Sequence, residues 1–174
     1  MAKKFTLSSL LTAVAALLGV VAIVMLFLPA VALDIESDVA KKVIAAALGG
    51  ESYTGLQVTF GLSKNDITYF GFSFMNLLPY LLRLGGVVLA LLNVFGKKPS
   101  KLFAIIAAAL FIVAGILFFC TVGFAAVNED LTKLFSALKG DVKDYLALSA
   151  GPIVAGILSI LAGVGAATPL FLKK

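Results

Sequence analysis

The chain has 174 residues, of which 61% are hydrophobic and only 13% are charged. A soluble domain of this length carries about twice that share of charged residues, so the composition excludes an ordinary soluble domain. The net charge of +5 is reached without any histidine and with one cysteine, Cys120. An intramolecular disulfide and an imidazole-based metal site are therefore both excluded.

The charged residues occur in clusters that leave four long apolar stretches. Three stretches carry no charge, and the fourth holds a single arginine, Arg83. Each stretch exceeds the roughly 20 apolar residues that a helix needs to cross a bilayer. The sequence therefore predicts a single-domain (1–174), α-helical integral membrane protein with four transmembrane helices, at about 6–31, 76–95, 101–127 and 145–172.

The first predicted helix has an alternative reading as a secretory signal. Lys3 and Lys4 form a basic start, and Ala30-Val31-Ala32 resembles a small-residue cleavage site. However, the apolar run is much longer than the roughly 7–15 residues of a signal core. We therefore expect an uncleaved transmembrane helix.

The loop between the first two spans, 32–74, shows two kinds of periodicity. Ser37 or Asp34 can cap a short helix that Gly49-Gly50 can end. Its predicted apolar stripe comprises Val39, Val43, Ile44, Ala47 and Leu48.

After these glycines the period changes to two, because apolar residues alternate from Thr54 to Leu62. Turn-forming residues follow at 63–66, and then comes a second aromatic segment, 67–74. The pattern predicts a β-hairpin outside the membrane.

The second loop, 128–144, predicts another short amphipathic helix. Its apolar residues recur at helical spacing: Leu131, Leu134, Phe135 and Leu138. The turn between the second and third spans is short and basic, and Ser100 can cap the third span.

The lysines predict how the chain is oriented. One side of the membrane would hold seven lysines and no acidic residue: Lys3, Lys4, Lys97, Lys98, Lys101, Lys173 and Lys174. The other side would hold six lysines and all nine acidic residues. Because cytoplasmic segments are enriched in lysine and arginine, we expect both termini to be cytoplasmic in a multi-pass protein of the cell membrane. The basic charge then indicates attraction to anionic lipids rather than to nucleic acid.

Small and polar residues recur along the spans at steps of three and four. The predicted helix-packing seam includes Gly19, Gly86, Ala90, Asn93, Gly156, Ser159 and Gly163. Small side chains let helix backbones approach closely in a membrane, and this spacing is typical of a left-handed bundle.

Arg83 lies on such a seam, about seven residues below the outer end of its helix. Leaving it unpaired would cost at least about 2.5 kcal/mol. In the first interpretation Arg83 is structural, because buried polar residues often tie helices together, and its side chain extends outward to meet Asp34, another loop carboxylate or a lipid phosphate. In the second it binds an anion or a lipid headgroup with Asn76, Tyr80 or Ser149 nearby.

The topology resembles that of the claudin and PMP22 class of four-helix membrane proteins. The segment "YTGL", Tyr53–Leu56, is similar to their Gly-Leu-Trp segment, although this chain lacks tryptophan and a cysteine pair in its first loop. The stretches "YTGLQVTFG" and "FSFMNLLPYLL" are similar to small uncharacterised membrane proteins of Gram-positive bacteria. The resemblance implies a bacterial membrane setting and no particular activity.

The four spans contain no Asp or Glu, and the chain has no glycine-rich phosphate loop or cofactor motif. We therefore expect a non-enzymatic protein with no cofactor and no metal. Its β-containing loop region would mediate assembly, as a homo-oligomer or with another membrane protein, among membrane lipids. The alternative is a channel or carrier for an anion or lipid, with Arg83 as the selective charge. An intramembrane enzyme is the third and weakest possibility.

Overall fold

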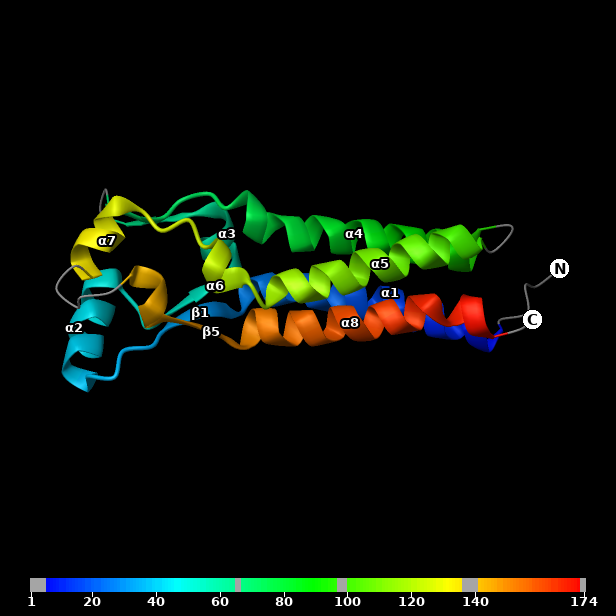
Figure 1. Cartoon of the computed structure of the whole chain (residues 1–174), viewed down its shortest axis with the longest axis horizontal. Helices are drawn as coiled ribbons and strands as arrows, with labels where there is room; N and C mark the ends of the chain where they lie inside the picture. Colours follow the sequence, from blue (N-terminus) through cyan, green and yellow to red (C-terminus); the bar gives the residue numbers. More distant parts are fainter. Residues whose placement is uncertain (1–5, 65–66, 97–99, 136–140, 173–174) are drawn as a thin grey trace. The chain divides into compact units, whose positions relative to one another are not determined.

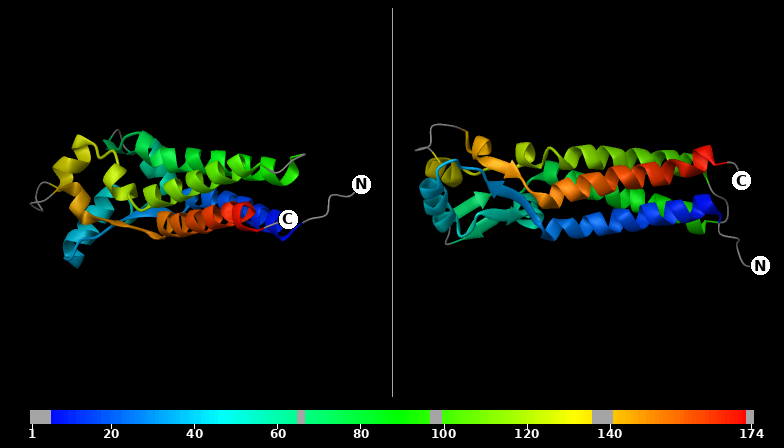
Figure 2. Two further views of the ribbon diagram at one scale, coloured as in Figure 1. Left: turned by 45° about the vertical axis from the view of Figure 1, so that its right-hand side comes forward. Right: turned by 90° about the horizontal axis from the view of Figure 1, so that it is seen from below.

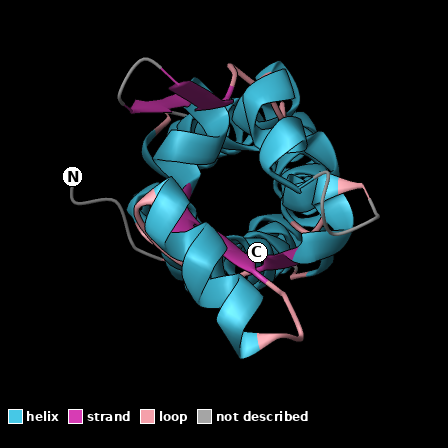
Figure 3. Cartoon of the chain, turned by 90° about the vertical axis from the view of Figure 1, so that its left-hand side faces the viewer, coloured by secondary structure: helices cyan, strands magenta, loops and turns pink. Residues whose placement is uncertain are grey.

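The computed structural model describes residues 6–64, 67–96, 100–135 and 141–172. The chain divides into two compact units, which we describe separately. The helical unit comprises Met1–Val24, Leu78–Leu117 and Val154–Lys174, and the mixed unit comprises Met25–Leu77 and Phe118–Ile153. Helix predominates over strand (Figure 3). The strands of the described residues all lie in the mixed unit.

Four long helices supply the helical unit: α1 (Leu7–Val24), α4 (Phe74–Phe95), α5 (Lys101–Phe118) and α8 (Ala150–Phe171). They run side by side, with α1 beginning and α8 ending at the end where α4 leads to α5 (Figures 1 and 2). Each is long and apolar enough to cross a membrane, α1 together with the short 3₁₀ helix η1 (Met25–Phe27). These helices suggest a multi-pass membrane protein, as the sequence predicts, whereas the left-handed crossing stays a prediction.

Small side chains fill the interior of the helical unit. Its core cluster is mostly alanine, with one valine and one phenylalanine: Ala15, Ala16, Val87, Ala90, Ala107, Ala108, Phe111, Ala162 and Ala166. Larger apolar residues such as Leu17, Leu84 and Val164 are exposed. This arrangement is expected of helices whose outer faces meet hydrocarbon.

A three-stranded antiparallel sheet organises the mixed unit. Strand β1 (Pro29–Leu33) lies between β2 (Ser52–Thr54) and β5 (Leu146–Leu148), so that Val31 stands opposite both Tyr53 and Leu148. Residues 29–31 and 146–148 are predicted to be helical, and the structure corrects both predictions, because they lie in β1 and β5. Pro29 lacks the N–H that a continued helix would use, and the β1 backbone instead pairs on both sides.

The predicted helix of the first loop is confirmed as α2 (Asp38–Leu48). Ser37 caps its start by accepting a hydrogen bond from Ala40 N, and Gly49 ends it with a φ of 77°. A left-handed residue at this position favours glycine. The predicted apolar stripe is only partly correct, because Ile44 and Leu48 are buried while Val39 and Val43 face outward.

The strand predicted from Thr54 to Leu62 is wrong. Residues Gly55–Phe60 form a short helix, α3, which begins with a capping box. Gln57 N donates to Thr54 Oγ1 at 3.3 Å, and Thr54 N donates to Gln57 Oε1 at 2.9 Å. A hairpin is present but shorter than predicted, formed by β3 (Leu62–Lys64) and β4 (Ile67–Phe70). The turn residues at 65–66 lie outside the described residues.

The second loop folds onto the first. The segment after α5, which includes this loop, carries α6 (Thr121–Phe124), α7 (Glu129–Phe135) and the 3₁₀ helix η3 (Val142–Tyr145). Of the predicted apolar residues, Leu131 and Phe135 of α7 are buried, Leu134 is exposed, and Leu138 lies outside the described residues. Backbone hydrogen bonds join the loops, from Gly71 N to Ala126 O (2.8 Å) and from Asn128 N to Tyr69 O (3.1 Å). Both loops therefore contribute to one core.

The third long helix is shorter than predicted. Helix α5 ends at Phe118 rather than near 127, and Cys120 follows as the exposed residue that precedes α6. Thr121 Oγ1 donates to Phe118 O at 2.7 Å, within the mixed unit. This hydrogen bond occupies a carbonyl that the end of a helix would otherwise leave open.

Candidate functional site: a buried arginine in the helical unit

Arg83 is the largest fully buried side chain of the described residues, with 0% of its surface exposed. It lies on α4, inside the helical unit and away from the outer face. Its Nη2 donates a hydrogen bond to the main-chain oxygen of Ala155 on α8. The arginine therefore contacts α8 through a backbone acceptor.

A second polar group lies one helical turn further along α8. Ser159 is fully buried, and its Oγ has no hydrogen-bond partner among the described residues. Buried hydroxyl groups of native proteins are almost always hydrogen-bonded, so this one stands out. Because Ser159 follows Ala155 by four residues, it shares the face of α8 that receives Arg83.

The charge of Arg83 has no carboxylate counterpart in the sequence of the spans, because α1, α4, α5 and α8 contain no Asp or Glu. The hydrogen bond from Arg83 to Ala155 O goes to an uncharged main-chain group. Tyr80 lies one turn earlier on α4 and is half-buried. This environment combines a cation with neutral polar groups, which suits either an interhelical tie or the binding of an anion.

The four residues predicted to bind an anion or lipid headgroup fall into two units. Arg83 and Tyr80 belong to the helical unit, and Asn76 and Ser149 belong to the mixed unit. Asn76 is buried, and its side-chain amide has no hydrogen-bond partner among the described residues. Ser149 is half-buried and donates its backbone N–H to Ala30 O at 2.9 Å, extending the pairing of β1 with β5. The predicted set is therefore divided between the two units, and its role in binding stays a prediction.

The residues of the predicted packing seam are all buried: Gly19, Gly86, Ala90, Asn93, Gly156, Ser159 and Gly163. The glycines lie at close approaches between helices. A Cβ added to Gly163 would lie 3.1 Å from Ala108 O, and one added to Gly19 would lie 2.8 Å from Phe111 Cε1. Their role as packing residues stays a prediction that these contacts support.

Phe111 is a packing residue that the sequence pattern does not predict. Its ring lies against Gly86 as well as Gly19, where an added Cβ would come within 3.1 Å. A large side chain that fills the space left by two glycines has no signal in its own helix. It could be identified only if the contacts of α5 with α1 and α4 were known, and a single sequence does not give those contacts.

Asn93 has a local task at the end of α4. Its Oδ1 accepts a hydrogen bond from Ser100 N at 2.7 Å, and Ser100 Oγ in turn accepts one from Phe103 N at 3.5 Å. The first turn of α5 therefore begins with the predicted serine cap. Asn93 links that cap back to α4.

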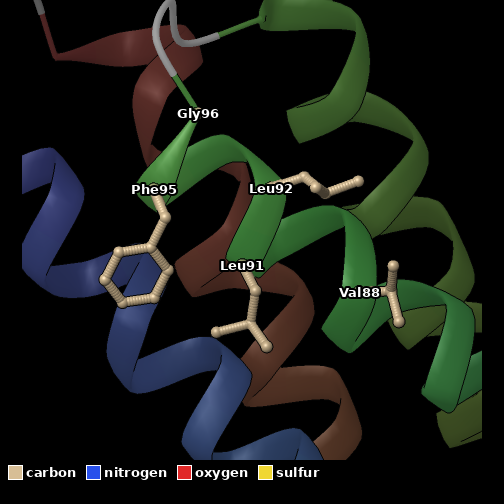
Figure 4. Close-up of a pocket in the computed structure, with 5 residues that line it drawn as sticks. All are labelled: Val88, Leu91, Leu92, Phe95 and Gly96. Atoms are coloured by element: carbon tan, nitrogen blue, oxygen red, sulfur yellow. The ribbon is translucent and has the colours of Figure 1, made fainter.

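The outer face of α4 carries a shallow apolar depression of about 360 Å³, lined by Val88, Leu91, Leu92, Phe95 and Gly96. Figure 4 shows these side chains projecting from one stretch of the helix. No polar or charged side chain lines it. In a bilayer such a surface meets acyl chains, and it provides no group for catalysis or for selective binding.

No group of three or more His, Cys, Asp or Glu side chains in the described residues could hold a metal ion. The sequence matches no known protein-family model, and no curated protein and no solved structure matches it significantly. The claudin and PMP22 resemblance therefore stays a prediction.

Proposed function

We propose that the chain is a non-enzymatic, multi-pass protein of the cell membrane whose mixed unit mediates assembly outside the cytoplasm. The orientation rests on lysine placement, because seven lysines and no acidic residue flank the ends of the spans at the termini and the α4–α5 turn. The mixed unit then faces the other side of the membrane. Its own hydrophobic core, shared by both loops, supports an independently structured surface there.

The outward face of α2 carries the proposal. Val39 and Val43 are 73% and 64% exposed, although they stand one turn apart on a helix whose other face packs in the core. Ala46 and Ala47 continue this exposed stripe by another turn. A contiguous apolar stripe on a water-exposed helix is typical of a protein interface.

A second copy of the chain is the occupant that we propose for this stripe. A two-fold symmetric pair places the same patch on both subunits, so a single helix face is enough to build it. The valines would supply apolar contact, and the two alanines would let the helix backbones approach. A different membrane protein on the same stripe is the other outcome that the test distinguishes.

The test is the mass of the detergent-solubilised protein, measured by light scattering. We expect the unaltered chain to be oligomeric and the double variant Val39→Asn, Val43→Asn to be a monomer with unchanged helix content. Glu129→Gln, an exposed substitution on α7, is the control and should leave the mass unaltered. A strictly monomeric protein that brings no partner through purification would count against the proposal.

The alternative, a channel or carrier for an anion or lipid, is favoured by one observation. The spans hold a buried cation, no carboxylate, and a buried serine hydroxyl without a partner among the described residues. Arg83 would be the selective charge. Its complete burial and its hydrogen bond to a backbone carbonyl favour the structural tie more strongly, so we place this function second.

Flux of small anions into liposomes tests the alternative. Arg83→Leu should abolish the flux, and Arg83→Lys should retain part of it because the positive charge is kept. Circular dichroism of each variant shows whether the helices still form. If the unaltered protein carries no anion, or if Arg83→Leu keeps its selectivity, this second function is excluded.

A further inference from the structure

The short helix α3 has one buried and one exposed face. Val58 and Thr59 are buried in the mixed unit, whereas Leu56 and Phe60 are exposed. No charged residue occurs from 52 to 63 or from 67 to 82. The exposed face of α3 is therefore apolar without any flanking charge, in contrast to α2 with its lysines and aspartate.

Two hydrogen bonds place α3 beside the ends of two candidate membrane spans. Gly55 N donates to Leu28 O at 3.1 Å, directly after the span that ends at Phe27. Ser73 N donates to Thr59 O at 2.8 Å, directly before the span that begins at Phe74. All of these contacts lie within the mixed unit. The helix is thus held at the level where these two spans end.

Exposed apolar residues continue from α3 along both neighbouring segments: Phe27, Leu28, Phe72, Phe74 and Met75. The rings of Phe60 and Phe72 contact each other, with centroids 6.3 Å apart. Phe27 and Phe74 already belong to the candidate spans. The aromatic surface around α3 is therefore continuous along the chain with surface that a membrane would cover.

We propose that α3, through Phe60 and Phe72, lies in the interfacial layer of the bilayer and contacts lipid. An amphipathic helix lies in this layer with its apolar face buried against the acyl chains. Aromatic side chains are enriched at the same depth, where they anchor a protein relative to the membrane surface. The mixed unit then meets the membrane along α3 as well as through its four chain connections. This inference concerns lipid contact and holds whether or not α2 mediates assembly.

Because the chain has no tryptophan, a single introduced tryptophan reports on its own surroundings. We compare Phe60→Trp with two reference variants in phosphatidylcholine vesicles. Leu17→Trp, on the exposed face of α1, represents the hydrocarbon, and Glu129→Trp, exposed on α7, represents water. The probes are lipids brominated near the headgroup end of their acyl chains and aqueous iodide.

We expect brominated lipid to quench Phe60→Trp about twofold more strongly than Glu129→Trp, and iodide to quench it less. Phe72→Trp should behave like Phe60→Trp, since the two rings are in contact. Quenching of Phe60→Trp by iodide to the extent seen for Glu129→Trp would overturn the proposal. Protection from both quenchers would also overturn it, because protein rather than lipid would then cover α3.

Discussion

The two units have opposite distributions of large and small side chains. The helical unit buries alanine, glycine and one arginine and exposes leucine, valine and isoleucine. The mixed unit buries large residues such as Leu131, Phe70 and Phe135 and exposes most of its charges. The difference matches the solvent that each unit is expected to meet. Water drives large apolar side chains into the interior. Hydrocarbon does not, so close packing of helix backbones is the main source of stability there.

Substitution of two fully buried phenylalanines, one in each unit, allows a direct comparison of the units. Phe135 lies in the core of the mixed unit, and Phe111 lies between glycines of the helical unit. Phe135→Ala removes both the free energy gained by transferring the ring out of water and the packing contacts of the ring. We therefore expect a loss of about 3–5 kcal/mol in the free energy of unfolding. Phe111→Ala removes packing contacts but little free energy of transfer from water, because its surroundings are helices that face hydrocarbon. We therefore expect about half of that loss.

Urea titration followed by tyrosine fluorescence suits the first variant, because Tyr53, Tyr69 and Tyr145 lie in the mixed unit. SDS titration followed by circular dichroism suits the second. Phe95→Ala, on the exposed face of α4, is the control and should change little. Equal losses for Phe111 and Phe135 would contradict the idea that the two units fold in different solvents.

Gly115 tests whether close approach of backbones stabilises the helical unit. A Cβ at this position would lie 3.0 Å from Gly156 O and 2.8 Å from Ile160 Cγ1 on α8. We expect Gly115→Ala to cost about 1–3 kcal/mol in the SDS titration, because α5 and α8 must move apart. Gly123→Ala is the matched control, since an added Cβ there meets nothing within 4 Å. If both changes are neutral, small residues are not what holds these helices together.

Tyr53 makes the mixed unit sensitive to alkaline pH. Burial raises the pKa of Tyr53 from 10.0 to about 12, and the charge of nearby Tyr69 adds to the effect. The unfolded chain therefore releases this proton first, and the contribution of Tyr53 to stability is present below pH 10 and is lost as pH rises towards 12. We expect the unaltered protein to lose up to about 2 kcal/mol more than Tyr53→Phe over this interval.

The measurement is a series of urea midpoints between pH 8 and 12, taken by far-UV circular dichroism for both proteins. Near neutral pH the two should differ little, because the Tyr53 hydroxyl makes one long hydrogen bond, of 3.4 Å to Gly50 O. Parallel curves up to pH 12 would show that the phenol is more open to water than its surroundings suggest.

The sequence predicts the helical unit better than the mixed unit, for a physical reason. Hydrophobic stretches of bilayer length are long signals, and each of the four long helices overlaps one of the predicted stretches, although three of the helices are shorter than predicted. Pairing between distant strands leaves no local signal in the sequence, so the sequence does not predict the β2–β1–β5 sheet. Pro29 indicates only that the first helix ends near it. The site shows the same limit, because Arg83 could be placed on an inward seam, but neither its acceptor on α8 nor Phe111 could be identified.

The sequence also holds a local signal for α3, although its alternating pattern predicts a strand. A substitution at this helix has the smallest effect on stability that we predict. The alternation from Thr54 to Leu62 is a two-residue period, but Thr54 and Gln57 also match the threonine-x-x-glutamine pattern of a capping box. That local pairing prevails because both hydrogen bonds form at the first turn of the helix.

Thr54→Ala should lower the free energy of unfolding by about 1 kcal/mol in the urea titration, whereas Thr54→Ser should lower it less because serine keeps the accepting oxygen. If α3 also lies in the membrane interface, Thr54→Ala will increase iodide quenching of Phe60→Trp, and stability alone would not explain that change.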